Sequence, residues 1–532
     1  MNLYNAIFAK SRVKDFAVWY EGRQLTYQDL QHETDVMGNA LRRLSVNSGE
    51  RVAILLNDSP EFIATFLSAW SLGAIAVPIN MGLRAEAQTD IMNDCTARVA
   101  VVEVDFCNQL FTGAWEKLHS LTDIVVIERN QGDVELVRSA AVNRASLDQG
   151  IRIHSFKKLS SEISSRRSED FPDAISNKAA FILYTSGSTG EPKGAVHCIA
   201  DIFYTNDTYA REVLQLRDGD RLFSSSRLPF AYGLGNGFTF PLLNGRTTIL
   251  CREKPTPEVI DRILREAQPT ILFAVPVVYT ALLDYHHTVQ ALDCPSLRLC
   301  ISAGEALPAR IGEEWERTFG VSVLDGIGST EMLHMWMSNN EGDVRYGSSG
   351  KLLRGYEARL LDPEGNATVG GEEGNLWVRG ASAAMGYWQR PNETARVFVD
   401  GWVRTGDLYR RDTEGYWYHR GRSDDCFKSG GQWVSPIEVE SVLLRNSAVA
   451  TAAVVEDFDD HQLPCASAFV TKRDPRVSSA SVEADLREQC RAALPRFKQP
   501  RRYIFVGELP YTATGKIQRF KLRQMLRPKT RE

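Results

Sequence analysis

The stretch that decides the fold is Phe181-Ile182-Leu183-Tyr184-Thr185-Ser186-Gly187-Ser188-Thr189-Gly190-Glu191-Pro192-Lys193-Gly194. An apolar strand runs directly into a loop of glycines and hydroxyl side chains, which ends at a lysine. Glycines let backbone amides come close to an anion, hydroxyls add donors, and the lysine adds a point charge. The combination predicts a loop that holds a polyphosphate. It is not a Walker A loop, because Gly194 follows Lys193 and the glycine spacing does not fit.

Around this loop, apolar runs of a few residues alternate with longer amphipathic stretches. Residues 52–56, 99–102, 124–127 and 270–275 are typical of buried strands, and residues 257–267 are typical of a helix. The alternation predicts an α/β fold with two parallel-type sheets wrapped by helices. The polar, Ser-rich residues 152–173 predict a surface connector.

The pattern changes after this region. Residues 356–418 contain short strand-like segments, with turns at 362–365 and 400–401, and predict a small β-rich lobe. After Gly421-Arg422 the pattern is α+β, with helices expected at 437–444 and 482–493.

Length and charge limit the functions that are open to the chain. Its 532 residues are too many for one hydrophobic core, and two to four lobes are expected. The net charge of -5 argues against a nucleic-acid binder, which needs an excess of Lys and Arg. Nine cysteines without a Cys-x-x-Cys pair fit a reducing cytoplasm and signal no zinc site. The sequence leaves open whether the chain forms a homodimer.

Residues 62–79 carry no charge and are about as long as a short membrane span. The Ser59-Pro60-Glu61 stretch before them is typical of a helix N-terminus, and Gly73 interrupts the run. We therefore expect a helix followed by a buried strand, and no membrane segment.

Four further segments complete a known pattern. In chain order they are Asp-Gly-Ile-Gly-Ser-Thr-Glu at 325–331, Trp-Val-Arg-Thr-Gly-Asp at 402–407, Gly-Arg-Ser-Asp-Asp at 421–425 and Pro-Tyr-Thr-Ala-Thr-Gly-Lys at 510–516. Together with the loop that ends at Lys193, they resemble the motifs of the adenylate-forming superfamily. That superfamily contains acyl- and aryl-CoA synthetases, the adenylation domains of peptide synthetases and firefly luciferase. The resemblance covers nearly the whole chain, in the family's order.

The resemblance implies ATP, Mg²⁺ and coenzyme A as cofactors. Thr330 and Glu331 would meet phosphate and magnesium, with Glu331 as the metal ligand, and Lys516 would stabilise charge during adenylation. Asp407 and Arg422 would hold the ribose. The other residues expected at the nucleotide are Thr185, Ser186, Gly187, Ser188, Thr189, Gly190, Lys193, Ser302, Ala303, Gly304, Glu305, Asp325, Gly326 and Ile327.

The resemblance also implies two domains. Residues 1–423 would form the N-terminal AMP-binding domain, and residues 424–532 a mobile C-terminal domain that hinges at Asp424. Rotation of the second domain would remove Lys516 and present Lys428. The passage for the pantetheine arm of CoA would be lined by Gly430, Gly431 and Trp433.

Residues 229–236 and 329–335 resemble the benzoate–CoA ligase subgroup. By that resemblance the acid would bind in a flat apolar slot, sized for one ring, that is lined by Ala231, Tyr232, Ala303, Gly328, His334 and Met335. The implied function is an ATP-dependent aryl-CoA ligase for benzoate or a small substituted benzoate such as 2-aminobenzoate. One departure concerns Ile327, which stands where the superfamily commonly has an aromatic residue that stacks on adenine.

Three alternatives stay open. A stand-alone adenylation enzyme would load the aryl acid onto a carrier protein instead of CoA. A nucleotide-binding sensor on the same scaffold would carry out no chemistry, and a light-emitting oxygenase would need a luciferin pocket. The joint presence of Thr330, Glu331, Asp407 and Lys516 argues against the sensor, and nothing in the sequence indicates the oxygenase.

Overall fold

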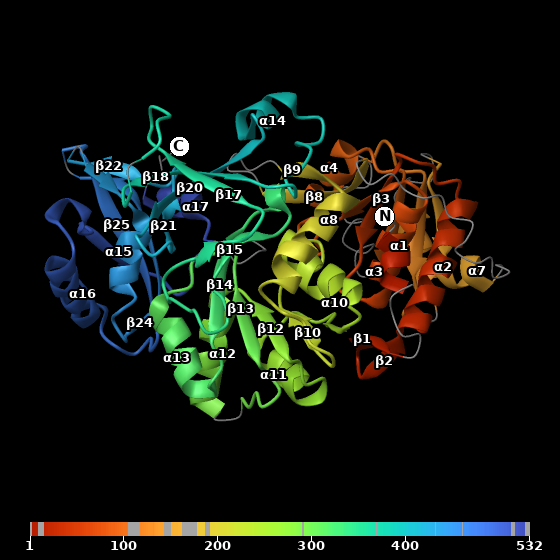
Figure 1. Cartoon of the computed structure of the whole chain (residues 1–532), viewed down its shortest axis with the longest axis horizontal. Coiled ribbons are helices and arrows are strands. Elements are labelled where there is room, and N and C mark those ends of the chain that lie inside the picture. Colours follow the sequence, from red (N-terminus) through yellow and green to blue (C-terminus); the bar gives the residue numbers. More distant parts are fainter. Residues whose placement is uncertain are drawn as a thin grey trace.

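In the computed structural model, the chain forms a broad molecule with β-sheets at its centre and helices on the outside (Figure 1). It describes residues 3–8, 15–104, 118–130, 132–142, 150–161, 178–186, 192–289, 292–368, 370–430, 432–459, 461–511 and 517–526. Of residues 138–142, 186 and 433 it describes the backbone only.

The N-terminal sheet has the order β7-β6-β5-β3-β4-β8-β9 in the described part of the chain. All neighbours run parallel except β8 and β9, which form an antiparallel hairpin. The strands are β3 (Arg51–Leu55), β4 (Ile75–Pro78), β5 (Val99–Glu103), β6 (Asp123–Ile127), β7 (Arg152–Ser155), β8 (Ala179–Ser186) and β9 (Pro192–Cys198). The strands expected at 52–56, 99–102 and 124–127 are confirmed.

The central sheet has the order β16-β15-β14-β13-β12-β10-β11-β1-β2 among the described residues. Its middle strands are parallel, and antiparallel strands close both ends. The strands are β1 (Phe16–Tyr20), β2 (Arg23–Thr26), β10 (Arg221–Ser224), β11 (Thr247–Leu250), β12 (Ile271–Ala274), β13 (Leu299–Ser302), β14 (Val323–Gly328), β15 (Met335–Ser338) and β16 (Lys351–Leu352). β12 confirms the strand expected at 270–275.

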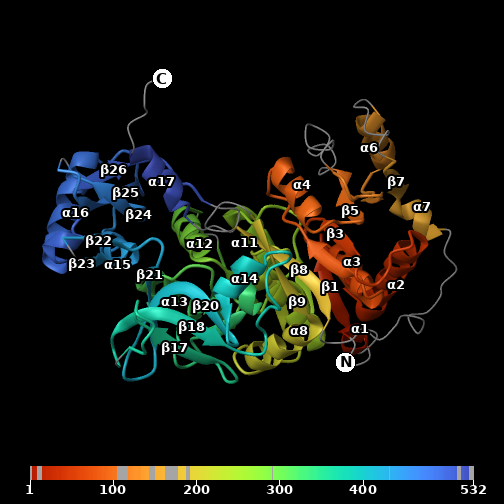
Figure 2. The ribbon, with the colours of Figure 1, turned by 90° about the horizontal axis from the view of Figure 1, so that it is seen from above.

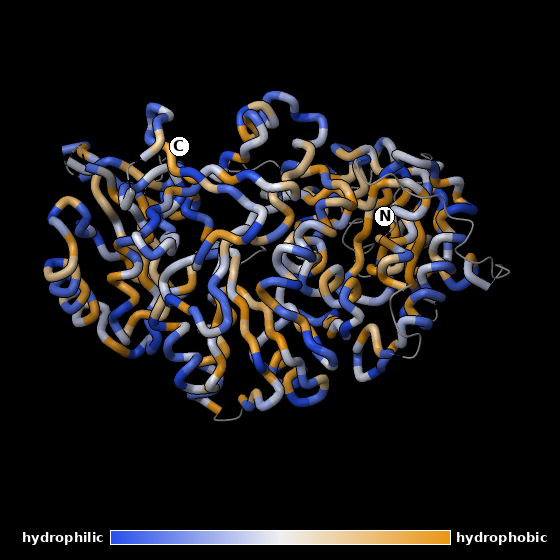
Figure 3. Tube along the Cα trace, viewed as in Figure 1, coloured by the Kyte–Doolittle hydropathy of each residue, from blue (hydrophilic) through white to orange (hydrophobic). Residues whose placement is uncertain are grey.

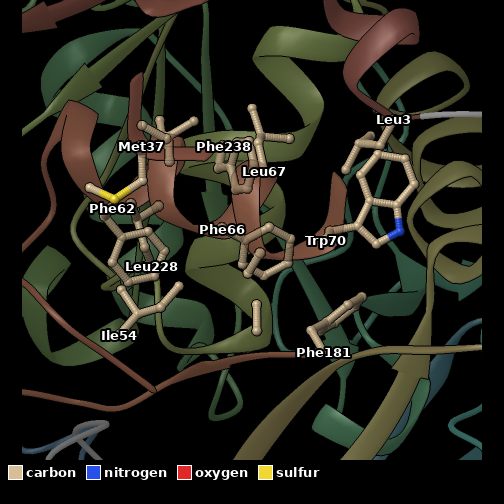
Figure 4. Packing of buried hydrophobic residues seen from close by; sticks show 14 of the residues in the cluster. Leu3, Met37, Ile54, Phe62, Phe66, Leu67, Trp70, Phe181, Leu228 and Phe238 are labelled. Carbon is tan, nitrogen blue, oxygen red and sulfur yellow. The ribbon is translucent and has the colours of Figure 1, made fainter. Parts of the chain in front are cut away.

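Alternate residues of each strand pack on opposite faces, as strand geometry requires. Ile54 belongs to the core between the two sheets, together with α2 (Tyr27–Arg43) and α3 (Pro60–Ser71), whose Phe62, Phe66 and Trp70 are shown in Figure 4. Leu55, the next residue, packs on the opposite face with α4 (Ala85–Asp94). Figure 3 shows the hydrophobic residues concentrated on these strands and on the inward faces of the helices.

The outer face of the central sheet is covered by α11 (Pro257–Glu266), α12 (Pro276–Val289) and α13 (Ala309–Phe319). Thr256 caps α11 by accepting a bond from the N–H of Val259, and Pro257 occupies its first turn. The helix expected at 257–267 is therefore confirmed within one residue.

The uncharged residues 62–79 form all but the first two residues of α3, a turn at Gly73 and the buried strand β4. Ser59 caps α3 through a 3.3 Å bond from the N–H of Phe62, and Pro60 is its first residue. The expected helix followed by a strand is confirmed. Among the helices that the structure describes, none has the length and apolar character needed to cross a bilayer.

Strands of the N-terminal and central sheets have their carboxyl ends at a shared, buried ionic cluster. Glu103, at the end of β5, is fully buried and accepts bonds from Arg252 Nη2 at 2.8 Å and from the N–H of Asn57 at 3.2 Å. Arg129, after β6, reaches Glu61 at 2.7 Å and Glu103 at 3.5 Å. These charges tie the end of β11 to the ends of β3, β5 and β6, so the cluster joins the two sheets.

The small β-rich lobe expected at 356–418 is confirmed. Its order is β17-β18-β20-β19 in the described residues, with β21 pairing on β20, and all neighbours are antiparallel. The strands are β17 (Glu357–Leu361), β18 (Glu373–Arg379), β19 (Phe398–Val399), β20 (Trp402–Arg411) and β21 (Trp417–Arg422). Asp400 and Gly401 take positive φ at the β19–β20 turn.

The C-terminal part is α+β, as expected. β24 (Val449–Phe458), β25 (Pro464–Lys472) and β26 (Arg502–Phe505) form one sheet. α15 (Pro436–Leu443) and α16 (Ser479–Ala493) pack on it and confirm the helices expected at 437–444 and 482–493. α17 (Arg519–Leu526) follows, and β22 (Phe427–Ser429) pairs with β23 (Gln432–Val434).

One prediction is partly wrong. Residues 152–161 do not form a connector, because they make β7 and the helix α7 (Phe156–Ser161) at the edge of the N-terminal sheet. His154 Nε2 contacts the buried carboxylate of Asp123 at 2.7 Å, which gives this polar segment an anchor that its composition did not reveal. Residues 162–173 lie outside the described residues.

Candidate active site

The loop that ends at Lys193 is the turn of the β8–β9 hairpin. Thr185 pairs with Lys193 across the hairpin, so both lie beside the connecting residues 187–191. Gly187, Ser188, Thr189 and Gly190 lie outside the described residues, as does the side chain of Ser186. Their role as phosphate ligands stays a prediction.

The turn after β14 carries Thr330 and Glu331 and is held from two sides. His197, fully buried on β9, places Nε2 2.8 Å from the carbonyl oxygen of Thr330 and Nδ1 2.8 Å from Asp201 Oδ2. A carbonyl oxygen only accepts, so Nε2 carries the proton in this bond. On the other side, the N–H of Ala384 donates to the carbonyl oxygen of Glu331 at 2.8 Å.

Tyr387 connects Glu331 to the lysine of the hairpin. Its hydroxyl donates a bond of 2.6 Å to Glu331 Oε1, and Lys193 Nζ lies 5.9 Å from the centre of its ring. Burial, together with the negative charge of Glu331, raises the pKa of Tyr387 well above its usual range. The phenol therefore keeps its proton and remains the donor.

Asp407 and Arg422 are opposite each other on β20 and β21. Arg422 Nη1 lies 3.1 Å from Asp407 Oδ1 and also donates to the carbonyl oxygen of Thr405 at 2.9 Å. Arg422 is within electrostatic reach of Glu331 and Tyr387. The residues expected at the ribose and those expected at the phosphates therefore share one site.

The segment 302–305 follows β13 and lies beside β14. Ser302 pairs with Asp325, Ser302 and Ala303 are buried, and Gly304 takes a φ of +96°. The carboxyl of Asp325 is buried and accepts a 3.2 Å bond from the N–H of Leu307, so it supports the bend of this segment. Burial raises the pKa of Asp325 to about 8, and the carboxyl is largely protonated at neutral pH.

Gly326, Ile327 and Gly328 end β14 and pair with β15. A Cβ at Gly326 would lie 2.5 Å from the carbonyl oxygen of Met337, and one at Gly328 would lie 2.6 Å from that of His334. Only glycine fits at either position. Ile327 is half-buried and packs with the apolar residues beneath the small lobe.

Most residues expected to line the aryl slot lie together. His334 is buried, with ring centres 4.8 Å from Tyr209, 5.7 Å from Tyr232 and 4.7 Å from Phe240. Ala303 and Met335 belong to the same apolar cluster as Tyr232. Ala231 packs instead into the core between the two sheets.

His334 has one partnered nitrogen. Its Nε2 lies 3.2 Å from Asn236 Oδ1, whereas Nδ1 has no hydrogen-bond partner among the described residues. Burial lowers the pKa of His334 to about 3, so the ring is neutral. Because the amide oxygen accepts, the proton is on Nε2, and Nδ1 presents a buried acceptor.

The C-terminal part contacts the site through the residue after Lys516. The N–H of Ile517 donates to Glu305 Oε1 at 3.2 Å. Lys516 itself lies outside the described residues. A second contact joins Arg473 Nη1 to Asp284 Oδ1 on α12 at 2.7 Å.

The residues expected to line the passage for CoA lie away from the β8–β9 hairpin. Lys428 is exposed on β22, opposite Trp433 on β23, and Gly430 takes a positive φ. Gly431 lies outside the described residues. The views in Figures 1 and 2 both show β22 far from β8 and β9.

The predicted hinge residue Asp424 is exposed. It lies between Ser423, whose N–H donates to the carbonyl oxygen of Gly406, and Asp425, whose carboxylate accepts a bond from Arg523.

The described residues contain no group of three or more His, Cys, Asp or Glu side chains arranged to hold a metal. A cation at Glu331 would therefore draw most of its ligands from bound phosphates and water. That is how proteins commonly bind Mg²⁺ in nucleotide sites, with one or two carboxylates. The donor at Glu331 fits this ion.

Three residues of the site were missed from the sequence: His197, Tyr387 and Asn236. His197 lies four residues after Lys193 on the same strand, so the two-residue period of a strand predicts that both side chains are on one face. Tyr387 and Asn236 are 56 and 98 residues from their partners. No local pattern marks them.

Comparison with known proteins gives two family matches. Residues 7–388 match the model of the AMP-binding enzyme, and residues 438–516 match that of the AMP-binding enzyme C-terminal domain. The chain is also similar to the benzoate–CoA ligase of Thauera aromatica, with 41% identity over 505 residues that cover 94% of this chain and 90% of that protein.

Two solved structures share the fold across both chains. An anthranilate CoA ligase in complex with anthranoyl-AMP has a TM-score of 0.88 and 35% identity, covering 99% of this chain and 97% of that one. A benzoate CoA ligase from Burkholderia xenovorans LB400 has a TM-score of 0.86 and 34% identity, covering 98% and 100%.

Proposed function

We propose, since the chain belongs to the AMP-binding enzyme family, that it is an ATP-dependent aryl-CoA ligase. It activates benzoate or a small substituted benzoate, such as 2-aminobenzoate, as the aryl-adenylate and then transfers the aryl group to CoA. The likeness to a benzoate–CoA ligase over nearly the whole of both chains carries this proposal.

The reaction has two steps because a carboxylate is a poor acyl donor. In the first, a carboxylate oxygen bonds to the α-phosphorus of ATP, the bond from that phosphorus to the oxygen bridging to the β-phosphorus breaks, and pyrophosphate leaves. In the second, the deprotonated sulfur of CoA attacks the acyl carbon and AMP leaves. The enzyme's task is chiefly positioning and charge neutralisation.

The phosphate end of ATP would lie at the β8–β9 turn. Lys193 and Thr185 flank the turn, and Thr330 and Glu331 approach it from the end of β14. Mg²⁺, bound through Glu331 and phosphate oxygens, would neutralise charge on the phosphates. His197 and Ala384 hold the backbone of the two β14-turn residues in place.

The nucleoside would extend from the phosphates toward the small lobe. Asp407 suits ribose hydroxyls as an acceptor, and Arg422, 3.1 Å away, holds that carboxylate and adds a donor. Adenine would pack between Ile327 and the backbone of 302–305, without aromatic stacking. The buried Asp325 supports that backbone at Leu307.

The aryl ring would occupy a slot bounded by Tyr232, His334, Gly328 and Ala303. Gly328 lets β14 approach the backbone of His334 and Met335 closely, because a Cβ there would lie 2.6 Å from the carbonyl oxygen of His334. The neutral Nδ1 of His334 would accept a bond from an amino or hydroxyl substituent. That group would then satisfy a buried acceptor that otherwise lacks a partner.

We also propose the division into residues 1–423 and 424–532, with the hinge at Asp424. The contact of Ile517 with Glu305 supports an arrangement in which Lys516 faces the adenylation site. Lys428, Gly430, Gly431 and Trp433 would reach the site only after the C-terminal domain rotates. The free thiols of the described cysteines fit a cytoplasmic location for such an enzyme.

Two half-reactions test the proposal. Purified protein with ATP, Mg²⁺ and benzoate is expected to release pyrophosphate, and addition of CoA is expected to give benzoyl-CoA. A pantetheinylated carrier protein replaces CoA in a parallel reaction. Thioester on the carrier but not on CoA would make the chain a carrier-loading adenylation enzyme. No pyrophosphate with any benzoate would reject adenylation of these acids.

A further inference from the structure

Tyr387 lies where two parts of the phosphate site come together. Its hydroxyl donates to Glu331 Oε1 at 2.6 Å, and its ring lies 5.9 Å from Lys193 Nζ. Both partners come from other elements, since Lys193 is on β9 and Glu331 follows β14. The phenol thus contacts the proposed metal ligand and the proposed phosphate lysine at once.

The backbone around Tyr387 is fixed before any ligand binds. Its neighbours Met385 and Trp388 donate N–H bonds to the carbonyl oxygens of Val196, at 2.8 Å, and Gly194, at 2.7 Å, on β9. The N–H of Tyr387 itself donates to Thr394 Oγ1 at 2.9 Å. The segment that carries the donor to Glu331 is therefore anchored to β9, the strand of Lys193.

We propose that Tyr387 is a positioning residue that orients the Glu331 carboxylate for Mg²⁺ in nucleotide binding. The inference rests on the proposed function. A hydrogen bond to one carboxylate oxygen restricts rotation of the side chain and directs the other oxygen toward the ion. Such outer partners of metal ligands commonly affect metal affinity or activity by about 10–100-fold when removed.

A purely structural role is the competing explanation. The ring of Tyr387 also packs edge-on against Phe398, with centres 5.6 Å apart. Tyr387→Phe keeps the ring, its packing and its contact with Lys193, and removes only the hydroxyl. The variant therefore separates orientation of Glu331 from packing.

The test measures binding of α,β-methylene-ATP by calorimetry over a range of Mg²⁺ concentrations. Tyr387→Phe is expected to need about tenfold more Mg²⁺ for half-maximal binding. Nucleotide affinity without Mg²⁺ is expected to stay unchanged, because the ring and Lys193 remain. The matched control is Tyr418→Phe, which removes a hydroxyl that bonds to Asp412 Oδ2 at 3.1 Å in a turn of the same lobe.

Kinetics separate failure of this inference from failure of the proposed function. The Mg²⁺ dependence of pyrophosphate release is expected to shift in Tyr387→Phe, while thioester formation from supplied benzoyl-AMP is unchanged. If the wild type is active and both variants share its Mg²⁺ dependence, the positioning role is wrong. If the wild type releases no pyrophosphate with any benzoate, the proposed function is wrong, and the calorimetry still decides the role of Tyr387.

Discussion

The N–H of Ile517 donates a hydrogen bond to Oε1 of Glu305 across 3.2 Å. Glu305 follows β13 in the N-terminal part of the chain, and Ile517 is the first described residue after Lys516. The two residues are 212 positions apart, so this bond reports the position of the whole C-terminal part. In the proposed mechanism, contact between the C-terminal part and the segment 302–305 belongs to the first half-reaction.

Lys516→Ala is expected to lower the rate of pyrophosphate release by at least about 100-fold, because it removes the positive charge that would stabilise the reacting phosphate in the transition state. Thioester formation from supplied benzoyl-AMP is expected to stay near the wild-type rate. Each half-reaction is measured separately, with Lys521→Ala on α17 as the control. Equal loss in both half-reactions would contradict a lysine that serves adenylation alone.

Arg473→Ala is expected to weaken the contact of the C-terminal part with α12 by removing the ion pair with Asp284. Partly exposed pairs contribute about 0.2–1 kcal/mol, so pyrophosphate release is expected to fall by up to about fivefold. Thioester formation from benzoyl-AMP is expected to be unchanged or faster. Arg476→Ala is the control, because it removes a local ion pair with Asp474, two residues away in the chain. If Arg473→Ala behaves as this control does, the pair does not hold the domains together.

Substrate pairs test the acceptor on His334. At each ring position, kcat/KM is measured for an aminobenzoate and for the methylbenzoate of similar shape. The amino compound is expected to be favoured by about tenfold at one position, because it satisfies Nδ1. His334→Phe is expected to abolish that preference, and His286→Phe on α12 is expected to keep it. A wild type indifferent to amino and methyl groups at every position would rule out this recognition.

The buried carboxyl of Asp325 predicts a pH dependence of stability. Burial raises its pKa to about 8 in the fold from an ordinary value of 3.8, so between these values the folded protein binds more protons than the unfolded chain. Stability therefore falls as pH rises through this window, by at most about 1.4 kcal/mol per pH unit.

Asp325→Asn removes that titration. Its melting temperature, relative to wild type, is expected to rise steadily between pH 5 and pH 8, roughly where the two pKa values lie apart. Asp474→Asn is the control. Hydrogen bonds from Arg476 lower the pKa of Asp474 to about 2, so Asp474→Asn is expected to change the pH dependence of stability only at acid pH. A constant difference between Asp325→Asn and wild type would show that Asp325 is ionised in the fold.

Local sequence patterns predicted the elements well. Ser59, Pro60 and the apolar run after them specify α3 and β4 because capping and burial act over a few residues. Among the described parts of the predicted motifs, Tyr387 links the β8–β9 hairpin to the turn after β14, and Asp407 and Arg422 pair on β20 and β21. What the sequence could not show were contacts between distant segments.

The missed contacts share a physical cause. His197 and Thr330 are 133 residues apart, and Glu103 and Arg252 are 149 apart. The strand period can place His197 on the face of Lys193, but it does not identify Thr330 as its partner, and neither contact can be predicted without knowing how the sheets and the lobe pack together. A lone histidine or a buried glutamate in a strand pattern looks the same whether or not such a partner exists.

β9 is the last strand of the N-terminal sheet, and residues 385–388 bond along its outer side. An uncovered strand of this kind is a template for pairing with strands of other molecules. The hydrogen bonds that place Tyr387 cover this side of β9, so they are expected to hinder such pairing. Substitutions that weaken the hydrogen bonds of residues 385–388 are expected to reduce the yield of unaggregated protein as well as its catalytic rate.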